Sequence, residues 1–305
     1  MPIGSIDETV YHELEGVVAA NLERHLTAAQ EWFPHEYVPW DEAADFERVP
    51  WELSQSRLPE VARTALVLNL LTEDNLPSYH FEVGTTLGRD GAWEAWLHRW
   101  TAEEDRHSIA IRDFLVATRG VDPVALERAR MAHMSRGFRS PYRGNVLHLI
   151  AYLVFQELAT RVSHRNTGKA SIDPACDRLL GRIALDENLH MLFYRDLLVA
   201  ALELAPDASV RAIAEVAATF QMPGNAIPDF GRRSLEIANA GIYDPRIHVE
   251  QVILPTLRTI GVFEMTGLSA EGEHAREQLT ATLATAERVA KRFTDRRDAR
   301  RSTSS

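Results

Sequence analysis

The sequence predicts an all-α protein on three observations. Apolar residues recur at helical spacing along most of the chain. Segments that alternate apolar and polar residues, as half-buried strands do, are hard to find. Prolines, glycines and polar clusters divide the chain into segments of roughly 15 to 30 residues, which are lengths that helices of a bundle adopt.

In chain order, the predicted helices span residues 5–31, 59–88, 91–118, 123–136, 142–165, 172–202, 207–221, 244–260 and 271–297. The stretch 32–51 is rich in proline and aromatic residues and predicts an extended connector on the surface of the helices. A second proline-marked stretch, 221–230, predicts a loop before the C-terminal helices. No low-complexity linker divides the chain, so we expect a single domain over 1–305 that ends in a basic, flexible tail at 290–305.

Composition limits the possible functions. The chain has 45% hydrophobic and 25% charged residues, as a globular protein with a full core does. The formal net charge of −11 argues against general nucleic-acid binding, which requires a basic face. The longest apolar run, residues 146–155, is much shorter than the ~20 residues that cross a bilayer, so no membrane span is predicted. The first residues lack the basic and apolar segments of a secretory signal, and we expect a cytoplasmic protein.

The residues that could bind a metal are acids and histidines. The single cysteine, Cys176, excludes both an intramolecular disulfide and a thiolate metal cluster. Two predicted helices contain Glu-x-x-His, formed by Glu104 with His107 and by Glu187 with His190. At positions i and i+3 the two side chains project from one helix face. Each helix can therefore offer one carboxylate and one imidazole to the same ion.

The spacing of these motifs is duplicated. Glu73 precedes Glu104 by 31 residues and Glu157 precedes Glu187 by 30, and both single glutamates lie in otherwise apolar helices. The chain thus repeats one pair of helices. A third Glu-x-x-His, at residues 271–274, has no matching upstream glutamate and is expected to be unrelated.

The repeat predicts a metal centre. A single glutamate from each of two helices and Glu-x-x-His from each of two others form the ligand set of ferritin-like di-iron and di-manganese bundles. This set suits two divalent irons, and a metal would remove the cost of burying unpaired carboxylates. Alternatively, the acids form buried ion pairs with arginines such as Arg99, Arg106, Arg161 and Arg182. The duplicated spacing favours metal ligation by Glu73, Glu104, His107, Glu157, Glu187 and His190.

Three further residues are candidates for supporting roles. Glu103 and Asp186 directly precede the ligand glutamates of the two motifs. Each could accept the free imidazole N–H of the histidine from the opposite repeat and so fix its tautomer. Thr160 follows Glu157 by three residues and could bring a hydroxyl near the metals.

The segments around the predicted ligands resemble the soluble acyl-[acyl-carrier-protein] desaturases of the stearoyl type. They read TEDNLPSY around Glu73, WTAEEDRH around Glu104, FQELATRVSHRNTG around Glu157 and DENLH around Glu187. EWFPHEYVP near the start, MPG at 222–224 and GLSAEG at 267–272 extend the likeness over nearly the whole chain. The actinobacterial members are more similar than the plant members.

The resemblance implies a homodimeric, ferritin-like enzyme with two irons per chain. Its reaction would introduce a cis double bond into a fatty acyl chain on acyl carrier protein, using O2 and electrons from a ferredoxin-type donor. The resemblance also implies an electron path through Trp32 and Asp186 to His107, and an oxygen-activating role for Thr160. An apolar slot for the alkyl chain is expected beside the metals.

Two segments depart from the plant pattern and leave the acyl chain length and the double-bond position open. The chain is several residues longer between SPY at 140–142 and Glu157, and the helix after Glu73 contains His80 and Glu82. Both segments would line or flank the acyl channel.

Three other functions remain as alternatives. The same metal centre could hydroxylate the acyl chain, in which case the product gains oxygen instead of losing two hydrogens. An iron-storage or catalytically silent acyl-carrier-binding protein would keep the fold, although the length and the complete ligand set argue against both. A radical-generating ribonucleotide reductase subunit would need a tyrosine such as Tyr79 or Tyr194 beside the irons.

Overall fold

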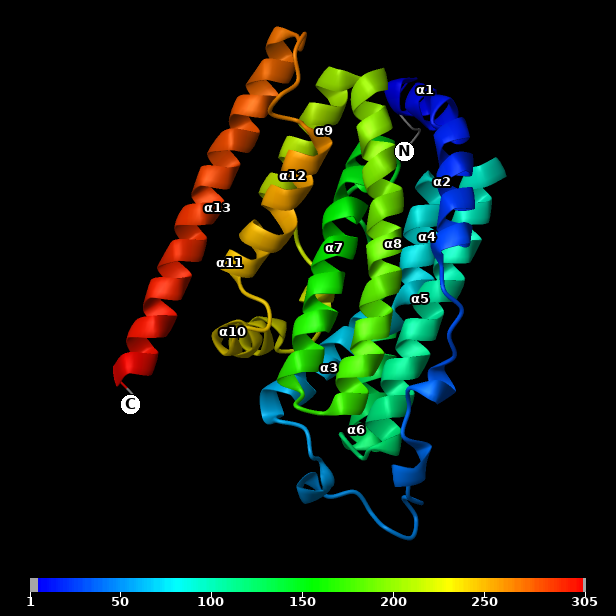
Figure 1. Ribbon diagram of the computed structural model, residues 1–305, viewed down its shortest axis with the longest axis vertical. Coiled ribbons are helices and arrows are strands. Elements are labelled where there is room, and N and C mark those ends of the chain that lie inside the picture. Colours follow the sequence, from blue (N-terminus) through cyan, green and yellow to red (C-terminus); the bar gives the residue numbers. More distant parts are fainter. Residues whose placement is uncertain (1–4, 304–305) are drawn as a thin grey trace.

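A four-helix bundle forms the centre of the molecule. The computed structural model describes residues 5–303 and contains helices and no strand within that range. Helix α3 packs against α5 and α7, and α8 packs against the same two helices, which closes the bundle (Figure 1). The four core helices are α3 (Glu60–Asp74), α5 (Gly91–Ala117), α7 (Val146–Ala170) and α8 (Pro174–Leu204). The predicted all-α, ferritin-like bundle is confirmed.

The remaining helices surround this core. Helix α2 packs on α5 and α8, α4 lies on α5 and α7, and the long α13 runs beside α9 at the edge of the molecule (Figure 1). Their bounds are α1 Ser5–Glu13, α2 Glu15–Ala28, α4 Leu76–Thr86, α6 Pro123–Met134, α9 Pro206–Thr219, α10 Phe230–Ala240, α11 Pro245–His248, α12 Leu254–Ile260 and α13 Ala270–Thr303. No described helix is both long enough and apolar enough to span a membrane.

Side-chain caps set where the two central helices begin. Asn145 accepts a hydrogen bond from the backbone N–H of His148 at the start of α7. Asp173 accepts from the backbone N–H groups of Ala175 and Cys176 at the start of α8, directly before Pro174. Such caps satisfy N–H groups that lack partners inside the helix. They help to fix the position of each Glu and His along its helix.

Helix α7 is buried on nearly every side along its first four turns, from Val146 to Leu158. A helix that is apolar all round lies in the interior of a large protein. Glu157 therefore lies at the centre of the bundle, surrounded by the apolar core.

Several helix boundaries differ from the predicted ones. The predicted helix 59–88 is divided at Asn75 into α3 and α4, because Pro77 has no N–H to continue the helical hydrogen bonds. The predicted helix 5–31 is likewise divided, at Leu14, into α1 and α2. Residues 249–253 form one π-helical turn within the predicted helix 244–260, just before Pro255.

The prediction missed helix α10 entirely. It follows the predicted loop 221–230, and Gly241, at a φ of 81°, ends it. The helix is amphipathic but short, and it directly follows the prolines of the predicted loop, so the prediction did not separate it from that loop. Helix α13 also extends beyond the predicted end at 297, through most of the predicted tail, to Thr303. Residues 304–305 of that tail lie outside the described residues.

Candidate metal centre

The six predicted ligands converge in the middle of the bundle. Glu73 comes from α3, Glu157 from α7, and the two Glu-x-x-His pairs from α5 and α8. All six side chains are buried. They form two groups that could each hold a metal ion, namely Glu73, Glu104, His107 and Glu187, and Glu104, Glu157, Glu187 and His190.

Two carboxylates belong to both groups. Glu104 and Glu187 lie between the histidines, so each is placed to bridge two ions. The Nδ1 atoms of the histidines face these carboxylates. His107 Nδ1 lies 3.2 Å from Glu187 Oε1, and His190 Nδ1 lies 2.9 Å from Glu104 Oε1. The two groups thus share two carboxylates and contain one histidine each, so together they would hold two neighbouring metal ions.

The donor atoms of this cluster fit a bound metal. Buried atoms without a hydrogen-bond partner include Glu104 Oε1, Glu157 Oε2, both carboxylate oxygens of Glu187, and the Nδ1 atoms of His107 and His190. Buried polar atoms are nearly always satisfied in folded proteins, because leaving them unpaired is costly. Their close contacts are with one another inside the cluster, and metal ligation would satisfy them together.

The electrostatics of the cluster also fit cations. Burial, and then the nearby carboxylate of Glu104, raise the pKa values of Glu73 and Glu187 well above their usual range. Burial alone would lower the pKa values of His107 and His190, but hydrogen bonds to carboxylates outweigh it and raise them. In the absence of metal, these raised pKa values favour bound protons, which offset the negative charge of the buried carboxylates. Two divalent ions would balance four carboxylates and leave the imidazoles neutral.

The arginines do not pair with the six predicted ligands. Among the described residues, Arg99 pairs with Glu103, while Arg106 and Arg182 pair with Asp186. The ion pairs of the six involve histidine only. Arginine pairing therefore does not account for the buried glutamates.

The two outer carboxylates lie where the repeat predicts. Glu103 accepts from Nε2 of His190 at 2.9 Å, and Asp186 accepts from Nε2 of His107 at 3.4 Å. Each histidine is thereby held with Nε2 protonated and Nδ1 facing the cluster. Burial alone would raise the pKa of Glu103, but the hydrogen bonds from His190 and His25 hold it well below its usual range.

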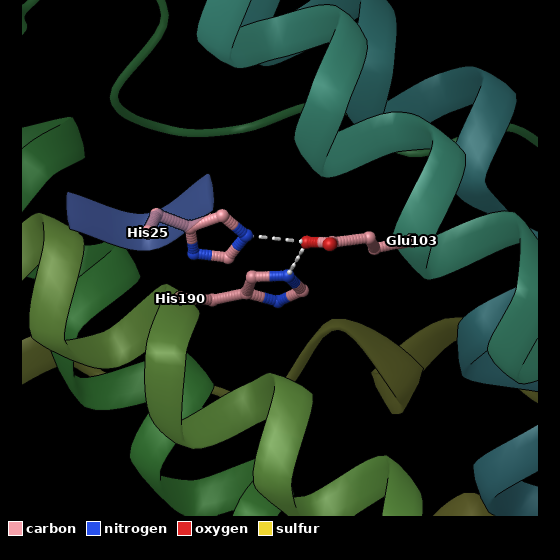
Figure 2. Close-up of side chains that lie close together, drawn as sticks. All are labelled: His25, Glu103 and His190. Carbon is pink, nitrogen blue, oxygen red and sulfur yellow. Dashed lines mark hydrogen bonds and ion pairs between the residues drawn. The ribbon is translucent and has the colours of Figure 1, made fainter. Parts of the chain in front are cut away.

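Each outer carboxylate has a second aromatic donor. Trp32 Nε1 donates to Asp186 at 2.8 Å, which connects the segment after α2 to His107. On the other side, His25 of α2 donates from Nε2 to Glu103 at 2.9 Å, so that one carboxylate oxygen receives both His25 and His190 (Figure 2). The two repeats thus have different second donors, an indole at Asp186 and an imidazole at Glu103.

Three residues in direct contact with this centre were not predicted. They are His25, His164, whose Nε2 donates to Glu73 Oε1 at 2.9 Å, and Trp100, whose Nε1 donates to Glu157 Oε1 at 3.2 Å. His164 follows Glu157 by seven residues and so lies on the same face of α7, a signal that the sequence contains. Trp100 precedes Glu104 by four residues and His107 by seven, so it too lies on the ligand face of its helix, whereas no comparable spacing points to His25.

Two other predicted features have simple outcomes. The hydroxyl of Thr160 donates to the backbone oxygen of Gln156 and accepts from its side chain, so its predicted role near oxygen stays a prediction. In the third Glu-x-x-His motif, His274 is exposed at the start of α13 and contacts neighbours on its own helix, as expected for an unrelated match.

A cavity of about 40 Å³ lies beside the cluster, as expected. Glu73 and Glu104 form part of its wall. The rest of the lining is largely aromatic and aliphatic and includes Tyr79, Val83, Trp100, Phe138, Leu149, Tyr152 and Leu153. Such a cavity suits an alkyl chain held against the carboxylates.

Comparisons with known proteins agree with this geometry. The fatty acid desaturase family matches residues 7–305. DesA1 of Mycobacterium tuberculosis, named as a candidate acyl-[acyl-carrier-protein] desaturase, is 46% identical over 298 residues, covering 94% of this chain and 88% of DesA1. The chloroplastic stearoyl-[acyl-carrier-protein] 9-desaturase of Gossypium hirsutum is 30% identical, covering 88% of this chain and 73% of that protein.

A solved structure shares the fold. The X-ray structure of DesA2 from Mycobacterium tuberculosis H37Rv, titled a candidate acyl-ACP desaturase, matches with a TM-score of 0.71 and 31% identity. The match covers 88% of this chain and 99% of the DesA2 chain. On the family match over residues 7–305 and these relatives, the chain belongs to the fatty acid desaturase family.

Proposed function

We propose that this chain is a di-iron, O2-dependent desaturase that introduces a cis double bond into a fatty acyl chain carried on acyl carrier protein. The observation that carries the proposal is the doubled, buried ligand set directly beside an apolar cavity. Family membership supports the reaction class, and the names of the relatives support the acyl-carrier substrate.

The proposed ligands are Glu73, Glu104, His107, Glu157, Glu187 and His190. When bound, two irons supply the O2 activation that is needed to remove hydrogen from an unactivated carbon. The chain holds the imidazoles in one tautomer through Glu103 and Asp186, which favours ligation through Nδ1. The cavity orients the alkyl chain and excludes water from the reacting carbons.

Electrons enter, in this proposal, from a ferredoxin-type donor by way of Trp32. The chain of contacts from Trp32 to Asp186 to His107 supports that route, because it leads from the connector to a proposed ligand without a gap. Thr160 is proposed to assist oxygen activation from its position one turn beyond Glu157. We also propose a homodimer, which light scattering of the purified chain tests directly.

Reconstitution tests the proposed reaction. The purified chain would be supplied with ferrous iron, ferredoxin, ferredoxin reductase, O2 and a panel of acyl carrier proteins loaded with saturated chains. We expect two irons per chain and a product that has lost two hydrogens. A product that gains one oxygen would replace desaturation by hydroxylation, and bound iron without an altered acyl chain would refute the enzyme proposal.

A further inference from the structure

The cavity beside the cluster lies in a series of hollows with shared walls. Thr72 lines both this inner cavity and an apolar cavity of about 100 Å³ on the side of α10. Phe138 lines the inner cavity and two outer grooves of about 390 and 460 Å³. Phe138 belongs to the segment between α6 and α7. The inner cavity thus adjoins the cavity beside α10 at Thr72 and the two outer grooves at Phe138.

The two walls differ in how they are held. The hydroxyl of Thr72 donates to the backbone oxygen of Leu68 in its own helix, and among the described residues it forms no hydrogen bond to another element. The other wall is tied across two elements by Glu82 of α4 and Arg143 of the α6–α7 segment. Arg143 Nε donates to Glu82 Oε2 at 2.8 Å, and its Nη2 contacts the other carboxylate oxygen. The backbone N–H of Gly144 donates a hydrogen bond to the hydroxyl oxygen of Thr86 and reinforces the connection.

Stability alone does not explain why a glutamate occupies position 82. Its side chain is 2% exposed and lines the inner cavity together with aromatic and aliphatic residues. An ion pair with one buried partner is often no more stabilising than apolar residues of similar volume. What the pair does provide is a fixed, charged surface that an alkyl chain does not displace at low cost.

The inner cavity is small for an acyl chain. One water molecule requires roughly 10–15 Å³ of cavity volume, so a cavity of about 40 Å³ holds only a few waters. The alkyl chain must therefore extend beyond this cavity, and side chains must move to admit it. Thr72, a small side chain, is the residue that lines both the inner cavity and the cavity beside α10. The wall toward the outer grooves instead contains the Glu82–Arg143 ion pair and the ring of Phe138.

We propose that the Glu82–Arg143 ion pair, together with Phe138 in the same cavity wall, closes the end of the acyl cavity and sets the longest chain that the enzyme accepts. The chain enters past Thr72, crosses the proposed metal ligands and ends at this closure. The inference rests on the proposed function and assigns its chain-length selectivity. It also explains why the two segments that depart from the plant pattern meet in the fold, since Glu82 lies in one and Arg143 in the other.

Binding measurements on the full-length protein test the closure without depending on turnover. Acyl carrier proteins loaded with saturated chains of increasing length would be titrated against the wild type, Glu82→Ala/Arg143→Ala and Arg139→Ala. Arg139 is exposed on the same segment, and the ion pair of Glu82 is with Arg143, so Arg139→Ala controls for loss of an arginine. Glu82→Met/Arg143→Met keeps more of the apolar volume if the alanine variant folds poorly.

Removing the pair joins the inner cavity to the outer grooves, so the preferred chain should become longer. We expect the ratio of dissociation constants for the wild-type optimum and a longer chain to shift by about tenfold or more toward the longer chain, since each methylene in an apolar site discriminates by that order. Product chain lengths should shift in the same direction, and Arg139→Ala should keep the wild-type profile.

Three results would contradict the closure. An unchanged length profile in both double variants would show that the pair does not limit the chain. A uniform loss of binding at every length would place the pair at the entrance or in a purely structural role. If the wild type binds no acyl carrier protein of any length, the proposed function itself fails and the closure fails with it.

Discussion

At the scale of single residues, Glu157 offers the sharpest test of the metal centre. It is fully buried in α7, and one of its oxygens has no hydrogen-bond partner. Glu157→Ala should remove most of the iron from the chain and abolish oxygen-dependent turnover, because no other carboxylate of α7 reaches the cluster. Iron content per chain, measured after reconstitution, checks this.

The third Glu-x-x-His motif supplies the matched control. His274→Ala changes a histidine of the same local pattern that lies exposed on α13, so iron content and turnover should stay at wild-type values. Full iron content in Glu157→Ala, or iron loss in His274→Ala, would refute the ligand assignment.

The six candidate ligands were predictable because Glu73 and Glu157 precede the two Glu-x-x-His pairs by nearly the same distance, a duplication that the third pair at residues 271–274 lacks. The residues that orient them were predictable only in part. Glu103 and Asp186 stand beside ligands in the sequence, so the repeat placed them. His25 comes from a helix outside the repeat and reaches Glu103 across 78 positions, a contact that depends on tertiary packing alone.

His25 therefore gives a second test at this scale. His25→Phe fills the same space and removes one of the two imidazole donors to Glu103 (Figure 2). Loss of an outer partner of this kind lowers metal affinity by roughly 10- to 100-fold. A metal titration of the folded variant checks the affinity, with exposed His12→Phe as the control. Wild-type affinity in His25→Phe would show that His25 does not position the site.

At the scale of helices, the start of α8 determines where Glu187 and His190 lie. Asp173→Ala removes the acceptor for two backbone N–H groups at the first turn of α8. Loss of such a cap costs about 1 kcal/mol of the free energy of unfolding. Denaturant unfolding of the metal-free chain measures it. Glu203→Ala, an exposed acid near the other end of α8, should cause no comparable loss, and equal stability of the two variants would contradict the capping argument.

Helix existence was easier to predict than helix limits for a physical reason. The apolar period runs through Asn75 and through the π-helical turn at 249–253, so the pattern alone gives no sign of either interruption. In both places a proline two residues further along removes the N–H that would continue the helix. Helix α10, which packs on α3, was missed for a different reason, since it is short and the prolines directly before it predict irregular backbone.

At the scale of the molecule, the cluster joins all four core helices. Its ligands come from α3, α5, α7 and α8, and the unfolded chain cannot hold them within reach of one ion. Metal binding should therefore stabilise the whole bundle and not one helix pair. A ligand at 100 times its dissociation constant raises the free energy of unfolding by about 2.7 kcal/mol when only the folded state binds it.

We accordingly expect ferrous iron, added without oxygen at that excess, to raise the midpoint of thermal unfolding, and a chelator to reverse the rise. Glu157→Ala should lose the response and His274→Ala should keep it, so the shift reports on the central cluster and not on exposed acids. Because stabilisation needs no substrate or electron donor, it separates the metal assignment from the proposed desaturation. A wild-type midpoint that does not respond to iron would show that the four glutamates and two histidines are a structural cluster of another kind.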